Sequence, residues 1–399
     1  TRKANERGNL NMSVKIGILT TFFSPNYGAA LQAYSLYVFL EKYCYEPEFI
    51  NYRKGNVVFY VPENMQEREQ KLSFFQLIMR KSKNAFIKLS KKLPRDSNSK
   101  LRDEEFIKFI SKFLKIGDTL YTSEKEFIDA VPGMSYDVFL CGSDQIWNPM
   151  VHNFDQVYYL NFKTNAKKIA YAPSIAYNQF TEREIKRICD SIRSIDYISV
   201  REKSTIIWLQ PYIEKKIHHV IDPTFLLSKN EWLTLPSEKR IEGNYILVYL
   251  LNYNEQNENI TKLISRYAKE NQYKIICLPY TNIKFPKDIH VEYRYDIAPN
   301  DFIHLLNGAE CIITNSFHAT ALSINFNKPF FVVSSRFRNQ GLQTRLSDLL
   351  ELTKLEHRKI YPDTEYIKDF HNIDYEAVNE VISVYRKYGE EYLLHAIGD

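Results

Sequence analysis

The sequence predicts an α/β fold with two doubly wound (Rossmann-like) domains facing each other across a cleft. It also predicts a helical basic insert in the first domain. Short buried strands alternate with helical stretches over most of the 399 residues, as is typical of parallel sheets. A polar linker at residues 235–244 divides this alternation into two similar halves.

The first domain is predicted to span residues 12–235. It begins with the strand "VKIGILTTF" and the helix after it, where Asn26 is placed as the N-cap. Gly28 leaves the first helical turn without bulk, so a ligand could approach the backbone closely there. After a helical insert at about residues 60–130, strands are predicted in "YDVFLC", "KKIAYA", "IDYISV" and "HHVID".

The second domain is predicted at residues 236–373, with strands in "YILVYLL", "YKIICLPY", "HVEYRY", "CIITNS" and "FFVVSS". Residues 374–399 read as a helix that packs back on the first domain. The polar residues 1–11 are expected to be a disordered tail or an expression remnant, with Met12 as the native start.

The basic character of the chain is local. Net charge is +5, and residues 71–100 alone hold nine Lys or Arg against one acid. Phe74, Phe86 and leucines are interleaved with these lysines, which leaves two interpretations. The favoured one is a solvated helix packed by its apolar side, and the other is a basic helix in contact with an anionic membrane. No nucleic-acid-binding motif accompanies the segment, so nucleic acid is not an expected partner.

Composition also bounds location and cofactors. No apolar run is long enough to span a bilayer and the N-terminus lacks the apolar core of a signal peptide, so we expect a cytoplasmic protein. The five cysteines are scattered, and the nine histidines form no HExxH motif. We therefore predict no metal site and no bound cofactor.

Polar side chains follow three buried strands of the first domain directly. They could bind sugar hydroxyls or an anion, because ligands of open α/β sheets bind at the carboxyl ends of the strands. Each has a structural alternative: Asp144 caps a helix, Trp147 lies in the core, and Arg201 pairs with Glu202 or another acid. The candidates are Ser143, Asp144, Gln145 and Trp147 after the first of these strands, Tyr171 and Ser174 around the end of the second, and Arg201 after the third.

A single histidine marks the corresponding position in the second domain. His318 lies where the strand "CIIT" passes into the helix that begins near Ala319. An arginine, a histidine at a helix start and polar loops at a cleft suit transfer of an anionic group to a hydroxyl, with the histidine as acid or base.

The segments "GSDQIWNP", "ISVRE", "IDPTFLL" and "TNSFHATALSINFNKPF", in this order, resemble the polysaccharide pyruvyl transferases. The resemblance implies a GT-B-like fold and phosphoenolpyruvate as donor substrate. The product would be a pyruvate ketal on two hydroxyls of a sugar in a cell-surface or capsular polysaccharide or its precursor, with a bacterial origin. By the same resemblance His318 is the proton donor or holds the donor, Arg201 binds the donor, and Asn315 and Ser316 contact substrate.

One position departs from the family pattern. Many members carry an arginine two residues before the histidine, where this chain has Ser316. Positive charge for the donor phosphate is then expected from one of four residues: Lys328, Arg336, Arg338 or Arg345.

Two further functions stay open on the sequence. A nucleotide-sugar glycosyltransferase of GT-B type would need an acid in the second domain, and the nearest candidate, Glu310, precedes its strand. A non-catalytic glycan-binding relative is favoured only by the missing arginine. A lipid-linked acceptor would bring the enzyme to the inner face of the membrane, through residues 71–100.

Overall fold

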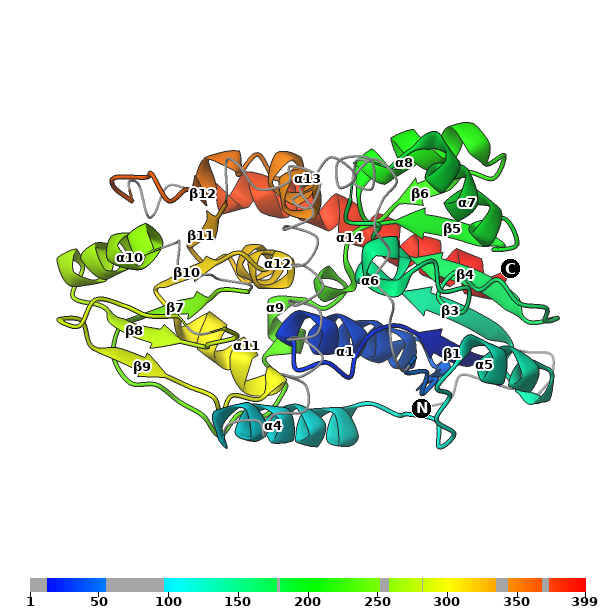
Figure 1. The fold of residues 1–399 in the computed structure, drawn as a ribbon, viewed down its shortest axis with the longest axis horizontal. Helices are drawn as coiled ribbons and strands as arrows, with labels where there is room; N and C mark the ends of the chain where they lie inside the picture. Colours follow the sequence, from blue (N-terminus) through cyan, green and yellow to red (C-terminus); the bar gives the residue numbers. More distant parts are fainter. Residues whose placement is uncertain are drawn as a thin grey trace, which may run out of the picture.

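The computed structural model describes residues 13–54, 97–177, 180–251, 258–281, 283–334, 344–367 and 373–399. Two parallel sheets of six strands each lie side by side, with helices packed against both (Figure 1). This confirms the predicted pair of doubly wound α/β domains, and the arrangement is GT-B-like. The proposed tail at residues 1–11 and the basic segment up to residue 96 lie outside the described residues.

The first sheet has the strand order β2-β1-β3-β4-β5-β6. Its central strands are buried along almost their whole length, as expected for a parallel sheet covered on both faces. The order reverses between β1 and β3, which makes their carboxyl ends the switch point where ligands bind in such sheets. The strands are β1 (Lys15–Leu19), β2 (Glu46–Phe49), β3 (Val138–Gly142), β4 (Lys167–Tyr171), β5 (Tyr197–Val200) and β6 (Ile217–His219).

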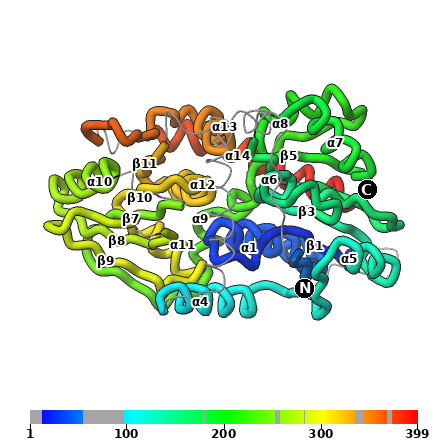
Figure 2. The backbone as a smooth tube through the Cα atoms, in the orientation of Figure 1, coloured from blue at the N-terminus to red at the C-terminus, as the bar shows by residue number. Residues whose placement is uncertain are grey.

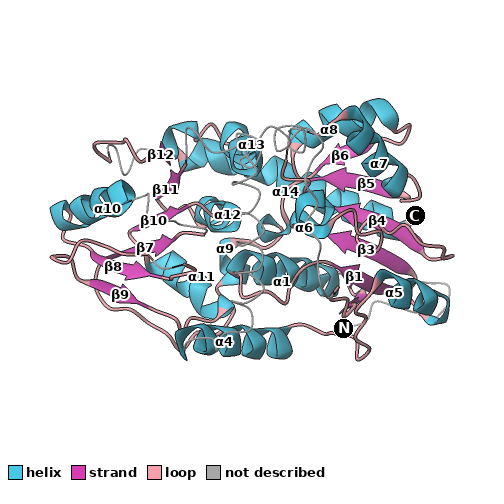
Figure 3. Cartoon of the chain, viewed as in Figure 1, coloured by secondary structure: helices cyan, strands magenta, loops and turns pink. Residues whose placement is uncertain are grey.

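The second sheet repeats this design with the order β12-β11-β10-β7-β8-β9. Its switch point lies between β7 and β10, whose register pairs Thr314 with Tyr249. The strands are β7 (Tyr245–Tyr249), β8 (Lys274–Cys277), β9 (Val291–Tyr293), β10 (Cys311–Thr314), β11 (Phe330–Val333) and β12 (Lys359–Ile360). Figure 3 shows the two groups of strands with helices between and around them.

The α-helices follow the predicted alternation, and Asn26 caps the first one by accepting a hydrogen bond from the Gly28 amide at 2.9 Å. In the described part of the chain they are α1 (Tyr27–Lys42), α4 (Ser97–Phe113), α5 (Glu124–Ala130), α6 (Pro149–His152), α7 (Glu182–Ile192), α8 (Lys203–Leu209), α9 (Lys229–Trp232), α10 (Glu258–Glu270), α11 (Pro299–Gly308), α12 (Phe317–Asn325), α13 (Thr344–Leu352) and α14 (Tyr375–Gly398). None of them combines the length and apolar composition needed to cross a bilayer.

Helices from both ends of the chain hold the two domains together. Tyr27 of α1 stacks on Phe302 of α11 with ring centroids 4.5 Å apart. The long helix α14 runs across the back of both domains (Figure 2). It reaches the second domain where Arg386 donates to Asn325 Oδ1 at 2.9 Å, and the first where Tyr392 donates to the Ala170 carbonyl at 3.0 Å. These contacts bring the two switch points face to face.

Candidate active site

The predicted residues Arg201 and His318 meet between the two switch points. Arg201 follows β5 directly, and its Nη1 lies 3.5 Å from Nε2 of His318 at the start of α12. The two residues are 117 positions apart in the chain. The structure therefore places one residue of each domain in a single buried cluster.

Two carboxylates lock the guanidinium of Arg201. Nη1 donates to Asp222 Oδ2 at 2.6 Å and Nε donates to Glu202 Oε1 at 3.1 Å. The guanidinium also lies over the Phe317 ring, with Cζ of Arg201 4.1 Å from the ring centroid. Burial alone would lower the pKa of Arg201, but Glu202, Asp222 and Asp144 outweigh it and raise the pKa. Arg201 is thus a fixed cation, whose Nη2 has no partner among the described residues.

Asp222 connects these groups, and the sequence interpretation assigned it no role. Oδ1 accepts from the amide and hydroxyl of Thr224 at 3.0 and 2.8 Å. Oδ2 accepts from Ser143 Oγ at 2.9 Å and lies 3.6 Å from His318 Nε2. Burial opposes its ionisation, yet His318 and Arg201 hold the pKa of Asp222 well below its usual range. An aspartate three residues after β6, in "IDPTF", was the available signal.

His318 is enclosed by both domains. Ser316 caps α12 by accepting from the Ala319 amide at 3.4 Å, which positions His318 in the first helical turn. On its other side the imidazole faces α1, where a Cβ added to Gly28 would lie 2.1 Å from His318 Nδ1. The space beside Gly28 is therefore filled by His318, which corrects the prediction that a ligand approaches the backbone there.

Asp144 and Gln145 form the first-domain wall of the cluster. Asp144 has a positive φ of 64° with ψ −170°, and its carboxylate accepts from Thr21 Oγ1 at 3.3 Å. It begins a 3₁₀ turn without capping it through its side chain. Arg345 is the second residue of α13. The side-chain amide oxygen of Gln145 accepts hydrogen bonds from Nη1 and Nη2 of Arg345, both at 3.2 Å.

Arg345 is the one candidate for the missing motif arginine that the described structure brings to the cluster. Burial and the charge of Arg201 lower the pKa of Arg345 to about 10. Its Nε has no partner among the described residues. Lys328 lies at the amino end of β11, away from the carboxyl ends of the strands where the cluster lies. Arg336 and Arg338 lie outside the described residues.

Two aromatic predictions were wrong. Trp147 is fully buried and donates its indole N–H to the Tyr158 carbonyl at 3.0 Å. Tyr171 is equally buried and donates to the Ile221 carbonyl at 3.0 Å. Both rings belong to the core of the first domain and present no face to a ligand, because strand-end position alone does not reveal which way a side chain turns.

The remaining candidates shape the backbone around the cluster. Asn315 bridges the two central strand ends, donating to the Leu251 carbonyl and accepting from the Leu251 amide, both at 2.6 Å. The Ser174 amide donates to the Asp144 carbonyl at 2.8 Å, and its side chain is buried. These contacts give both residues a supporting position behind the cluster.

The space beside the cluster is small. A cavity of about 20 Å³, room for roughly one water, is lined by residues that include Arg201, Asp222, Phe317 and Arg345. No group of three or more His, Cys, Asp or Glu side chains is arranged to hold a metal ion in the described part of the chain.

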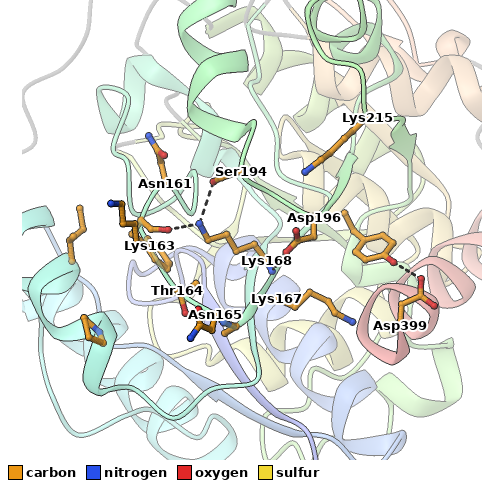
Figure 4. Close-up of a pocket in the computed structure, with 15 residues that line it drawn as sticks. Asn161, Lys163, Thr164, Asn165, Lys167, Lys168, Ser194, Asp196, Lys215 and Asp399 are labelled. Atoms are coloured by element: carbon orange, nitrogen blue, oxygen red, sulfur yellow. Dashed lines mark hydrogen bonds between the residues drawn. The ribbon is translucent and has the colours of Figure 1, made fainter.

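A much larger groove, of about 1320 Å³, lies at the other edge of the first sheet (Figure 4). Its lysines are engaged by backbone carbonyls: Lys167 donates to Ala396 at 3.0 Å, and Lys215 donates to Ile195 at 2.7 Å. Because it lies at the amino ends of β4 and β5, away from both switch points, we do not regard it as the active site.

The fold and this cluster define a two-domain α/β protein with an arginine, histidine and carboxylate site between its domains. The family model of the polysaccharide pyruvyl transferases matches residues 26–336. The match covers most of the chain, so the protein belongs to the polysaccharide pyruvyl transferase family. No curated protein matches the chain.

The chain is similar to several solved structures at low sequence identity. The UDP-GlcNAc 2-epimerase from Methanocaldococcus jannaschii is 13% identical, with a TM-score of 0.46 and coverage of 93% of this chain and 92% of that one. The glycosyltransferase SnogD from Streptomyces nogalater is 10% identical, with a TM-score of 0.40 and coverage of 95% and 96%. The E. coli heptosyltransferase WaaC is 10% identical, with a TM-score of 0.38 and coverage of 93% and 99%.

Proposed function

We propose that this transferase moves the enolpyruvyl group of phosphoenolpyruvate onto two hydroxyls of a sugar. The product is a pyruvate ketal on a cell-surface or capsular polysaccharide or its precursor. Family membership supports the pyruvyl transfer, and the chemistry of the cluster supports the donor. The acceptor class is carried by the family alone.

The observation that carries the donor is the pair of buried guanidinium groups. Arg201 Nη2 and Arg345 Nε have no partner among the described residues. The pKa of Arg345 is lowered because burial and Arg201 disfavour its charge, so a bound anion would stabilise it. Phosphoenolpyruvate carries a phosphate and a carboxylate, and each of these two nitrogens can donate a charge-assisted hydrogen bond to one of them.

His318 is the proton donor of this proposal. Ketal formation begins with protonation of the methylene carbon of the enol, which requires a general acid. The imidazole lies beside Arg201, the donor-binding cation, with Nε2 3.5 Å from Nη1 of Arg201 and 3.6 Å from Oδ2 of Asp222. General acid help of this kind contributes about 100 to 10,000-fold in rate.

A glycosyltransferase that uses a nucleotide sugar finds less support. Glu310 lies before β10, so it is at the amino end of that strand and away from the switch point. Asp348 of α13 lines the small cavity beside the cluster, but its carboxylate already accepts hydrogen bonds from the amide and hydroxyl of Ser204, at 3.2 and 2.9 Å.

The test is product analysis. The protein is incubated with phosphoenolpyruvate and a panel of galactose- and mannose-type oligosaccharides, free and lipid-linked, and the acceptors are examined by mass spectrometry. A ketal adduct together with released phosphate supports the proposal. Thermal stabilisation by a nucleotide sugar but not by phosphoenolpyruvate would favour the glycosyltransferase, and stabilisation by glycans alone a binding protein.

Membrane contact through residues 71–100 stays a prediction, because most of that segment lies outside the described residues. Vesicles with anionic lipid should bind the protein better than neutral vesicles at low salt. Equal binding to both would leave the solvated helix as the better interpretation.

A further inference from the structure

We propose that Asp144 is the catalytic base that takes the proton from the attacking sugar hydroxyl. This assignment rests on the proposed function. A ketal forms only if both sugar hydroxyls lose their protons, so the site needs a proton acceptor in addition to its acid.

Access distinguishes Asp144 from the other acids of the cluster. Three carboxylates act on the charge of Arg201: Glu202, Asp222 and Asp144. Glu202 and Asp222 are each only 1% exposed and are held by their hydrogen bonds to Arg201. Asp144 is partly exposed, and its side chain accepts from Thr21 Oγ1 at 3.3 Å and from the Gln145 backbone amide, without a hydrogen bond to Arg201 among the described contacts. Asp144 is the least buried of the three, so we assign to it the contact with the incoming hydroxyl.

The backbone of Asp144 gives a second, independent reason. Its φ of 64° with ψ of −170° lies in a region that is almost restricted to glycine. The conformation is held in place by the Ser174 amide, which donates to the Asp144 carbonyl at 2.8 Å. Residues with side chains keep such backbone strain mainly at functional sites, where the strain fixes the direction of a side chain. A glycine here would be relaxed but would carry no carboxylate.

The surrounding charges keep Asp144 ready to accept a proton. Burial raises the pKa of its carboxyl, but His318, Arg201 and Arg345 outweigh burial and hold the pKa below its ordinary value. Asp144 is therefore ionised at neutral pH. A carboxylate of low basicity suffices here, because a hydroxyl that adds to a cationic carbon becomes strongly acidic as the bond forms.

The proton balance closes with these two residues. His318 protonates the methylene carbon, which becomes a methyl group, and C2 becomes cationic. The first hydroxyl adds to C2 and gives its proton to Asp144. The bond from C2 to the phosphate oxygen then breaks, and phosphate leaves with the proton of Asp144. The second hydroxyl adds to the cation that remains, and its proton returns to His318. Donor and diol thus give ketal and phosphate, with both residues restored.

The experiment compares the full-length wild type with Asp144→Asn and Asp144→Gly. Asparagine tolerates a positive φ and keeps the size of the side chain but cannot accept the proton. We expect Asp144→Asn to lower kcat about 100 to 1,000-fold. The thermal shift produced by phosphoenolpyruvate should be retained. An acceptor with fluorine next to the attacked hydroxyl, which makes that hydroxyl more acidic, should recover part of the loss in the variant only.

Asp144→Gly tests the strain separately. It should be at least as inactive as Asp144→Asn, which has lost the same charge, while its melting temperature exceeds that of Asp144→Asn, because glycine adopts this backbone freely. Glu310→Gln, at the far edge of the second sheet, is the matched control and should change neither quantity.

Two results would overturn the assignment. They are a kcat of Asp144→Asn within threefold of the wild type, or a loss confined to the acceptor's KM. A melting temperature of Asp144→Gly below that of Asp144→Asn would contradict the role of the backbone strain. If the wild type itself forms no ketal from phosphoenolpyruvate, both the proposed function and this assignment are wrong. Wild-type ketal formation with an unaffected Asp144→Asn overturns the assignment alone.

Discussion

Gly28 and His318 lie against each other across the boundary between the two domains. A Cβ on Gly28 would lie 2.1 Å from Nδ1 of His318, well inside van der Waals contact. The glycine at the start of α1 is therefore needed for the position of the imidazole. The helix that packs the domains together also sets the geometry of the proposed acid.

Gly28→Ala is expected to displace His318 and to lower kcat about 100-fold, because a displacement near 1 Å in a reacting group costs roughly that much. Donor binding should change less, since Arg201 is held by its carboxylates. Steady-state kinetics and the thermal shift with phosphoenolpyruvate measure the two effects. Gly133→Ala is the control, because a Cβ there meets nothing within 4 Å. Unchanged kcat in Gly28→Ala would show that the ring can move without loss.

His318→Gln is expected to fold and to bind phosphoenolpyruvate while losing turnover about 100 to 10,000-fold, because glutamine keeps a polar group but cannot donate the proton. His318→Ala should behave similarly. In heavy water the wild type should place deuterium in the product methyl, measured by mass spectrometry. His290→Gln, on an exposed loop, serves as the control. Near-normal turnover in both His318 variants would make this histidine a structural residue of the helix start.

Arg201 and Arg345 should respond differently to lysine. Arg201→Lys leaves one of its two buried carboxylates, Asp222 or Glu202, without its partner, so we expect a raised donor KM and a stability loss of about 1–3 kcal/mol. Among the described residues, Arg345→Lys breaks contacts to the Gln145 amide alone, so it should raise the donor KM with little loss of stability. Kinetics with varied donor and urea unfolding separate the two. An effect of Arg201→Lys on the acceptor KM alone would contradict its role as donor ligand.

Asp155 should make stability depend on pH. Burial, only partly offset by the hydrogen bond from Tyr52 and by Lys54, raises the pKa of Asp155 to about 6. The stability that the protonated Asp155 gives to the folded state is therefore fully present below pH 3.8, the ordinary pKa of the carboxyl. It is lost as the pH rises through about 6. Asp155→Asn carries no such charge, so at pH 8 its free energy of unfolding should exceed that of the wild type by up to about 3 kcal/mol.

Urea unfolding at pH 4, 6 and 8 tests this prediction, and the two curves should converge at pH 4. Asp129→Asn removes an exposed carboxylate and should show no such pH dependence. A variant less stable than the wild type at every pH would mean that the ion pair with Lys54 outweighs the cost of burial.

The sequence alone determined the fold class and the two residues at the centre of the site. Buried strands leave runs of apolar residues, and amphipathic helices leave a different period, so both are visible locally. The edge strand β2 was not predicted from the sequence. Its residues "EPEF" are polar and include a proline, which is tolerated at the edge of a sheet but not in a central strand. Arg201 and His318 were predicted because Arg201 follows a strand directly and His318 begins the helix after a strand, at the strand ends where ligands bind in such sheets.

Only the tertiary structure decided which neighbours these residues have. Asp222 binds Arg201 from 21 positions away, and Gly28 touches a histidine of the other domain. The same packing turned Trp147 and Tyr171 into the core and brought Arg345 to Gln145. Local periodicity records whether a side chain is buried in its own element, but partners distant in sequence are chosen by the packing of whole domains, which no local pattern encodes.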